Sequence, residues 1–242
     1  MELESVGDRD DNAPGAIEGD TMRIGIIGAG NIGANLTRRL THLGLDVAVA
    51  NSRGPGTLAA LVQETGARAL SVVEVAQGAN LVIITIPEKN ISVLPAGFLD
   101  RADPEVIVVD TGNYYPQQRD GRIDAIEAGM TESRWVSEQI GHEVVKAFNA
   151  IYAVNLVARA RDHDAPDRMA IPIAGDEPAA KDAVMNLVLS MGFDPVDAGT
   201  IDNSWRQQPG TPVYGLDADA NGVRLALAAA HHVRTEEWRA QK

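Results

Sequence analysis

The sequence contains no cysteine among its 242 residues. This absence excludes a disulfide framework, a thiolate nucleophile, an iron–sulfur cluster and a zinc ribbon. Long hydrophobic runs are missing too. The longest, residues 81–86, is interrupted by Thr85, whereas a membrane helix requires about 20 apolar residues. We therefore expect no membrane partner. A chain of this length buries roughly three quarters of its unfolded surface, so it needs no metal to fold.

Basic residues are scarce. The chain has 21 Lys and Arg against 34 Asp and Glu, a formal net charge of −13. Without a basic stripe, nucleic acid is not an expected partner. Residues 1–21 hold seven acids and one base but few large apolar side chains, so we expect a disordered acidic tail there. The tail has no basic, apolar leader typical of secretion, and we expect a cytoplasmic protein.

Apolar, β-branched segments alternate with helical patterns over the first 150 residues. Apolar residues at helical spacing over 32–43 predict a helix. Thr57 is expected to cap a helix that ends at Gly66, and Ser71 and Glu74 have the spacing of a capping box. Strands are expected at 22–27, 47–50, 81–86, 106–109 and 144–148. This alternation predicts an α/β fold, a Rossmann-type doubly wound and mostly parallel sheet.

The rhythm changes after residue 149. Strands are expected at 169–174 and 193–197, and helices at 180–191 and 223–233. We expect a smaller C-terminal α/β cap packed on the main sheet. The predicted organisation is an acidic tail at 1–21, a Rossmann domain at 22–150 and a cap at 151–242.

A glycine-rich turn, Gly28-Ala29-Gly30-Asn31-Ile32-Gly33, joins the first strand to the first helix. This position is the one that a dinucleotide-binding fingerprint requires. Gly28 makes the tight turn, Gly30 lets the backbone approach the pyrophosphate, and Gly33 allows close helix–strand packing. The helix N-terminus supplies amide donors for phosphate. An ordinary glycine turn is the alternative reading.

Cofactor choice is read at the end of the second strand, where NAD enzymes place Asp or Glu. This chain has Asn51-Ser52-Arg53 there. Asn and Ser donate hydrogen bonds, and the planar guanidinium of Arg53 suits a 2′-phosphate, which an acid would repel. We therefore predict NADPH, the alternative being that Arg53 is only solvated at a loop tip.

Other candidates lie where further strands end. The segments Thr85-Ile86-Pro87 and Asp110-Thr111-Gly112-Asn113 each follow a strand, as does Asn149. Ligands of such sheets bind outside the carboxyl ends of the strands, so position alone makes these residues candidates. A structural turn is an equally good reading for any single one of them.

In combination, these segments resemble a known family. The glycine turn, Asn51-Ser52-Arg53-Gly54, Thr85-Ile86-Pro87, Asp110-Thr111-Gly112-Asn113 and 144–149 (VVKAFN) occur in the order found in NADPH-dependent reductases of the deazaflavin coenzyme F420. The related oxidoreductase domain of membrane metalloreductases is similar too. The likeness covers residues 22 to about 200, including the terminal Asp197-Ala198-Gly199.

The resemblance implies NADP(H) as cofactor and direct hydride exchange with a small-molecule ring acceptor, coenzyme F420 or a flavin. It also implies a homodimer whose C-terminal segment helps to form the acceptor pocket. From the strand-end positions and the resemblance together, we expect the cofactor to be bound by Gly28, Ala29, Gly30, Asn31, Ile32, Gly33, Asn51, Ser52, Arg53, Thr85, Ile86, Pro87, Asn113, Ala147 and Asn149.

The residues after Gly199 form an extension that the resemblance does not explain. Within it, Trp205 and Arg206 are candidates for a planar anionic acceptor, one by stacking and the other by charge. A place in a dimer interface is the alternative. The adjacent His231 and His232 are expected on one helix, where they cannot face the same ligand, so no metal site is expected.

Catalytic residues are not evident. His142 and Asn149 are candidates, His142 as a proton donor in a loop expected at the cofactor edge. Lys146 and Asn149 have the spacing of the catalytic pair in hydroxyacid dehydrogenases of the 6-phosphogluconate type, but here they follow a strand. Tyr114-Tyr115-Pro116 offers stacking on a flat substrate or packing at the sheet edge.

Three functions follow from these candidates. Hydride transfer between two flat rings needs orientation and water exclusion more than acid–base groups, which favours a deazaflavin or flavin acceptor. Reduction of a small imine or carbonyl requires a proton donor, such as His142 or a tyrosine. A non-catalytic NADP-sensing module is the third hypothesis.

Overall fold

The computed structural model describes residues 22–241. The predicted acidic tail, residues 1–21, lies outside the described residues. Within the described part, no helix has the length and apolar character needed to cross a membrane.

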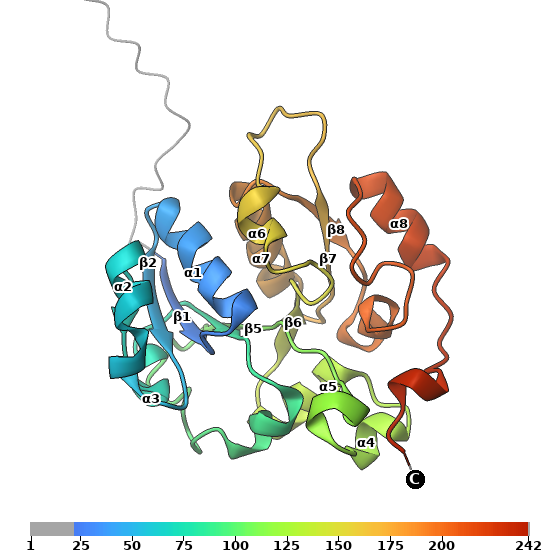
Figure 1. The fold of residues 1–242 in the computed structure, drawn as a ribbon, viewed down its shortest axis with the longest axis horizontal. Helices are drawn as coiled ribbons and strands as arrows, with labels where there is room; N and C mark the ends of the chain where they lie inside the picture. Colours follow the sequence, from blue (N-terminus) through green and yellow to red (C-terminus); the bar gives the residue numbers. More distant parts are fainter. Residues whose placement is uncertain (1–21, 242) are drawn as a thin grey trace, which may run out of the picture.

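A six-stranded parallel sheet forms the centre of the molecule, in the order β3-β2-β1-β4-β5-β6 (Figure 1). This sheet confirms the Rossmann-type fold class. Neighbouring strands that are far apart in sequence, such as β1 and β4, require the crossover connections of a parallel sheet. The strands are β1 (Arg23–Ile27), β2 (Asp46–Ala50), β3 (Arg68–Ala69), β4 (Leu81–Ile84), β5 (Ile107–Asp110) and β6 (Val144–Lys146).

Helices cover both faces of the sheet because successive side chains of each strand point to opposite sides. In β2, Val47 and Val49 belong to one apolar core, and Ala48 and Ala50 to the other. The helices of the first part are α1 (Asn31–His42), α2 (Ala59–Thr65), α3 (Val72–Val75), α4 (Asp124–Glu127) and α5 (Glu132–Ile140). Short helical turns lie between them: η1 (Pro55–Leu58), η2 (Glu88–Val93) and η3 (Pro116–Asp120).

The C-terminal third forms the predicted α/β cap. Two parallel strands, β7 (Ala170–Ile173) and β8 (Asp194–Asp197), pair with each other, and an antiparallel bridge between Lys146 and Ala174 joins this pair to β6. Side chains of β7 and α7 share one apolar core with the main sheet. The remaining elements are α6 (Asn155–Ala158), α7 (Pro178–Ser190), η4 (Ile201–Gln207), α8 (Ala220–Ala228) and η5 (Glu236–Trp238).

Two local predictions are wrong. Thr57 does not cap α2: it lies inside η1, where its hydroxyl donates to the Gly54 carbonyl (2.9 Å). The last helix ends at Ala228, so His231 and His232 lie on the segment that follows it. That segment runs beside α4 and α5, as the red end of the ribbon shows (Figure 1), with the Ala240 amide bound to the Glu127 carboxylate (2.8 Å). The capping box at Ser71 and Glu74 is confirmed.

Candidate nucleotide site

A cleft of about 810 Å³ lies at the carboxyl ends of β1, β2 and β4. It contains nine of the predicted cofactor residues, from the glycine turn, the end of β2 and the end of β4: Gly28, Ala29, Gly30, Asn51, Ser52, Arg53, Thr85, Ile86 and Pro87. The parallel sheet brings them together because the residues that follow each strand emerge at the same edge.

Each glycine of the turn has a different environment. Gly28 has φ +113°, a conformation that side chains rarely adopt, and its carbonyl accepts from the Thr85 hydroxyl (2.9 Å). A Cβ on Gly33 would lie 2.0 Å from the Gly28 carbonyl oxygen, so α1 and the turn touch there. A Cβ on Gly30 would meet no atom within 4 Å. The space over Gly30 is therefore open to a ligand.

Gly33, which is tightly packed, and Gly30, which is open, give a matched pair of variants. Gly33→Ala is expected to lower the melting temperature, because overpacking of this kind costs about 1–3 kcal/mol. Gly30→Ala is expected to keep the melting temperature, because its Cβ meets no protein atom, but to weaken NADPH binding about tenfold or more by filling the space that the pyrophosphate needs. Thermal denaturation and titration calorimetry measure the two effects. Equal melting temperatures for the two variants would contradict the packing role of Gly33.

The N-terminus of α1 is a second feature of the cleft. Its N-cap is Gly30, which gives no side-chain cap, and its first turn has no acidic residue. The first amides of a helix have no partner within the helix. Here no cap side chain satisfies them, so they are available to phosphate oxygens.

The loop after β2 is held by Asn51. The Asn51 side-chain oxygen accepts from the Arg53 amide (2.9 Å), and its amide nitrogen donates to the Thr57 hydroxyl (2.9 Å). Asn51 therefore shapes the loop instead of offering a free side chain. Ser52 and Arg53 are exposed at the cleft, where no acidic residue is among the lining side chains.

Sequence reasoning missed the outer wall of the cleft. Seven lining residues come from the start of α3 and from η2 and the loop after it: Ser71, Val72, Val73, Asn90, Val93, Leu94 and Pro95. One signal was present, since the capping box at Ser71 places a helix start beside the end of β2. The apolar side chain of Val93 is 74% exposed.

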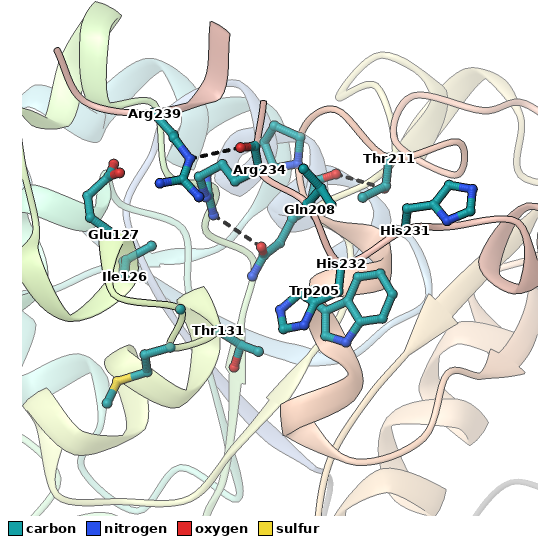
Figure 2. A pocket seen from close by; sticks show the side chains of 14 residues that line it. Ile126, Glu127, Thr131, Trp205, Gln208, Thr211, His231, His232, Arg234 and Arg239 are labelled. Carbon is teal, nitrogen blue, oxygen red and sulfur yellow. Dashed lines mark hydrogen bonds between the residues drawn. The ribbon is translucent and has the colours of Figure 1, made fainter. Parts of the chain in front are cut away.

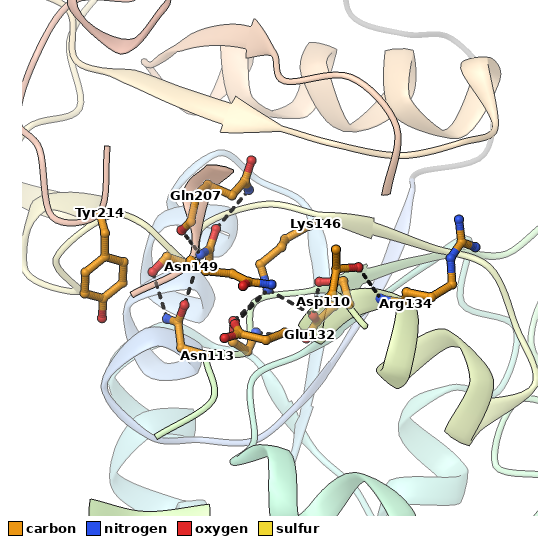
Figure 3. A network of polar contacts seen from close by, with 12 residues as sticks. Asp110, Asn113, Glu132, Arg134, Lys146, Asn149, Gln207 and Tyr214 are labelled. Carbon is orange, nitrogen blue, oxygen red and sulfur yellow. Dashed lines mark hydrogen bonds and ion pairs between the residues drawn. The ribbon is translucent and has the colours of Figure 1, made fainter. Parts of the chain in front are cut away.

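Six predicted residues do not line this cleft: Asn31, Ile32, Gly33, Asn113, Ala147 and Asn149. The last two follow β6, at the far edge of the sheet, and Ala147 is buried. Asn149 and Asn113 instead belong to a hydrogen-bond network with Gln207 (Figure 3).

In this network every polar group of the Asn149 side chain is used. Its amide nitrogen donates to Asn113 Oδ1 (3.0 Å) and to the Gln207 carbonyl (2.7 Å), and its oxygen accepts from Gln207 Nε2 (2.9 Å). The network ties the ends of β5 and β6 to η4. A role for Asn113 and Asn149 at the nicotinamide end stays a prediction.

Lys146 lies at the centre of a buried charged cluster (Figure 3). Its side chain is 0% exposed, its ammonium donates to the Gly112 carbonyl (3.0 Å), and it lies 3.6 Å from Asp110 and 3.7 Å from Glu132. Burial opposes the charged form, but the carboxylates of Asp110 and Glu132 outweigh it and raise the pKa of Lys146. Lys146 does not line the cleft, so the geometry gives it a structural role rather than that of a catalytic lysine.

Glu88, the first residue of η2, is the third carboxyl group of this cluster. Both of its carboxyl oxygens are buried without a hydrogen-bond partner among the described residues. Burial, and next the charge of Asp110, raise the pKa of Glu88 well above its ordinary value. Arg234 also belongs to the cluster, since it donates to Glu132 (2.7 Å). The two positive charges of Lys146 and Arg234 equal the two negative charges of Asp110 and Glu132. With Glu88 neutral, the cluster has no net charge.

The protonated state of Glu88 gives stability a pH dependence. Above pH 4.5, the ordinary pKa of a glutamate, the unfolded chain releases this proton while the folded protein keeps it. The free energy of unfolding therefore falls as pH rises towards the pKa of folded Glu88. Glu88→Gln removes this contribution, so the variant is expected to gain stability relative to the unmodified protein as pH rises. Urea denaturation from pH 5 to 8 measures it, and parallel curves would contradict a buried neutral Glu88.

The prediction that His142 lies at the cofactor edge is wrong. His142 precedes β6, and a residue that precedes a parallel strand lies at its amino end, opposite the cleft. It lines a separate cavity with Pro104, Val106 and Val144, and its ring bonds the Glu143 carbonyl (2.7 Å). His142 is therefore not placed to give a proton to a ligand in the cleft.

Neither Trp205 nor Arg206 lines the nucleotide cleft. The Trp205 ring stacks on the His232 ring with 4.6 Å between their centroids. The Arg206 guanidinium lies 5.5 Å from the centroid of the Trp205 ring. Trp205 and His232 belong to another cavity (Figure 2). Both tyrosines of the other candidate segment are engaged: the Tyr114 hydroxyl accepts from the Ile123 amide (2.9 Å), and the Tyr115 hydroxyl contacts that of Tyr214.

The sequence and the structure of this chain are similar to those of known proteins. The sequence profile of the family described as "NADP oxidoreductase coenzyme F420-dependent" matches residues 23–114, the part that builds the cleft. The hypothetical protein SMa0349 from Sinorhizobium meliloti has a similar structure, with 31% sequence identity and a TM-score of 0.70, covering 81% of this chain and 94% of that chain.

Two more distant proteins agree. A protein described as an F420-dependent NADP-reductase from Arthrobacter sp. FB24 shares the fold at 24% identity and a TM-score of 0.60, over 76% of this chain and 87% of that chain. The metalloreductase STEAP3 of Rattus norvegicus is 26% identical over 183 residues, 75% of this chain. The chain spans less than half the length of the curated relatives that it matches. The family resemblance noted in the sequence is confirmed.

Proposed function

Because this chain belongs to the family of coenzyme F420-dependent NADP oxidoreductases, we propose that it transfers hydride between NADPH and a deazaflavin, coenzyme F420, or failing that a flavin. One observation carries the proposal. Arg53 is the sole ionisable side chain among the described residues that line the cleft. Such a site orients two rings well but offers no acid or base to a substrate.

The residues present fit a dinucleotide. The open space over Gly30 admits a pyrophosphate against the backbone, and the uncapped amides of α1 are donors for its oxygens. The carbonyl side of the turn is fixed by Thr85, so these amides are aimed before a ligand arrives. The helix end and the open glycine thus support phosphate binding together.

Ser52 and Arg53 support a preference for NADPH over NADH. The Arg53 guanidinium binds phosphate oxygens with charge-assisted hydrogen bonds, and the Ser52 hydroxyl is a further donor. Asn51 holds both residues at the cleft by fixing the loop. A carboxylate at this point would bind a ribose hydroxyl and repel a 2′-phosphate, and none lines the cleft.

The remaining residues of the cleft exclude water and set orientation. When bound, NADPH supplies the hydride. Ile86, Pro87 and Leu94 give the cleft an apolar wall near the end of β4. Such a wall favours contact with the face of a flat ring over contact with a charged group. Holding two reactants in contact supplies much of the rate enhancement in reactions of this kind.

Reduction of a small imine or carbonyl is the runner-up, and a non-catalytic NADP sensor is the third possibility. The first would need a general acid such as a histidine or a tyrosine, and the lining residues include neither. The second predicts NADPH binding without turnover. Neither accounts for the family match as directly as transfer to a deazaflavin.

NADPH oxidation followed at 340 nm separates the three. The purified full-length protein is given NADPH with F420, with FMN or with a cyclic imine. Fast oxidation with F420, slower with FMN and none with the imine is the expected result. Oxidation with the imine alone would favour the runner-up, and NADPH binding without oxidation by any acceptor would favour the sensor.

A further inference from the structure

A second cavity, of about 150 Å³, shares no lining residue with the nucleotide cleft. Figure 2 shows it between the α4–α5 loop, the end of η4 and the C-terminal segment. A cavity of about this volume holds benzene in an engineered apolar protein interior. The space therefore suits a molecule of roughly six non-hydrogen atoms.

The wall formed by the C-terminal segment is held in place. Arg234 donates to Glu132 (2.7 Å) and to Gln208 Oε1 (3.1 Å). The Ala240 amide donates to Glu127 Oε1 (2.8 Å). These bonds join the segment to α4, α5 and the loop after η4, so the cavity is a built feature of the fold.

Gln208 presents an unused donor to this cavity. Its side-chain oxygen must be the atom that faces Arg234, because a guanidinium can only donate. The atom left over is the amide nitrogen Nε2, which is buried and has no partner among the described residues, in a residue only 8% exposed. In Figure 2 the nitrogen of Gln208 points into the space between Thr131 and Trp205. A buried donor left unpaired costs about 1–3 kcal/mol, which a ligand oxygen would recover.

Arg239 supplies a positive charge to the same cavity. Arg239 is exposed, and its Nε donates to the Arg234 carbonyl (2.9 Å). Its guanidinium forms no ion pair with a carboxylate among the described residues. Glu127, the one acidic residue among the described lining side chains, already accepts from Ala240. The guanidinium therefore keeps donors that suit an anionic oxygen.

Part of the remaining lining is apolar or aromatic, beside the polar side chains of Thr131, Thr211 and His231. Ile126, Met130 and Pro209 face the cavity, and the stacked rings of Trp205 and His232 form one side. A ligand thus meets the donors of Gln208 and Arg239 as well as apolar surface. This combination matches a short-chain carboxylate better than a fully hydrated inorganic anion.

We propose that this cavity is a binding site for a small monocarboxylate, with its carboxylate bound by Gln208 Nε2 and the Arg239 guanidinium. The hydrocarbon part lies against Ile126 and Met130. The site is separate from the nucleotide cleft, and the proposal is independent of which acceptor the protein reduces.

Titration calorimetry on the full-length protein, in a buffer free of carboxylates, tests it. The probes are butyrate, its neutral counterpart butyramide, and inorganic phosphate. Gln208→Glu keeps the acceptor for Arg234 and replaces only the donor that faces the cavity with a negative oxygen. Arg239→Ala removes the positive charge, and Arg224→Ala, on the exposed face of α8, is the matched control.

Butyrate is expected to bind the unmodified protein and Arg224→Ala with equal affinity. Its affinity for Gln208→Glu and for Arg239→Ala is expected to be lower by about tenfold or more. Melting temperatures check that each variant folds. Gln208 and Arg239 lie on different segments, so if one variant misfolds, the other still tests the proposal. Absence of butyrate binding, equal binding of butyramide, or unchanged affinity in the folded variants would overturn the proposal. Phosphate binding as tight as that of butyrate would overturn its selectivity for carboxylates.

Discussion

Lys146→Met is expected to lower the free energy of unfolding by about 3–5 kcal/mol, because it leaves buried carboxylates without their cation. Lys146 is fully buried, and Asp110 and Glu132 lie within 3.6 and 3.7 Å of its ammonium. Arg234 compensates only Glu132 directly. Urea denaturation at neutral pH measures the change.

Lys181→Met is the matched control. Its ammonium lies only 3.0 Å from Asp197, closer than Lys146 to either carboxylate, but Asp197 is 53% exposed. Exposed pairs contribute about 0–1 kcal/mol, so a small loss is expected. Similar losses for the two variants would show that distance rather than burial sets the energy, contrary to our account of the cluster.

Arg53→Ala is expected to weaken NADPH binding roughly ten- to a hundredfold and to leave NADH binding nearly unchanged. A charge-assisted contact to phosphate contributes on the order of 1.5–3 kcal/mol, which corresponds to that change in affinity. Arg53 lines the cleft beside Ser52, and NADH lacks the 2′-phosphate. Fluorescence titration with both cofactors measures it.

Arg68→Ala provides the control for this variant. Arg68 lies on β3, pairs with Asp46 (3.0 Å) and does not line the cleft. It is expected to change neither affinity. Equal weakening of NADPH and NADH by Arg53→Ala would contradict a contact with the 2′-phosphate.

Local sequence signals were enough for five of the six strands of the sheet and for the inner wall of the cleft, but the short edge strand β3 (Arg68–Ala69) was not predicted. The alternation seen in β2, where Val47 and Val49 face one core and Ala48 and Ala50 the other, is imposed by strand geometry. Gly28 and Gly33 are required by contacts within the turn itself and with Thr85, at the end of the neighbouring strand β4. Such features depend on neighbours that the topology fixes, so pattern and spacing predict them.

The buried cluster and the second cavity could not be predicted in this way. Lys146 meets Glu88 and Glu132 only after two crossovers have placed β4, β5 and β6 side by side. Arg234 reaches Glu132, 102 residues earlier in the chain, because the C-terminal segment leaves α8 and returns across α5. The His142 prediction was wrong for a different reason: in a parallel sheet a residue that precedes a strand lies at the amino edge, and the predicted strand at 144–148 already placed His142 there.

Deuteride transfer tests the central claim most directly. NADPH is labelled with deuterium on its reactive face and mixed with F420 and the full-length protein, and the products are analysed by mass spectrometry and NMR. We predict that the label appears on the reduced carbon of the deazaflavin with no loss to solvent, as direct ring-to-ring transfer requires. NADPH binding with no labelled deazaflavin, or a label found in solvent, would contradict it.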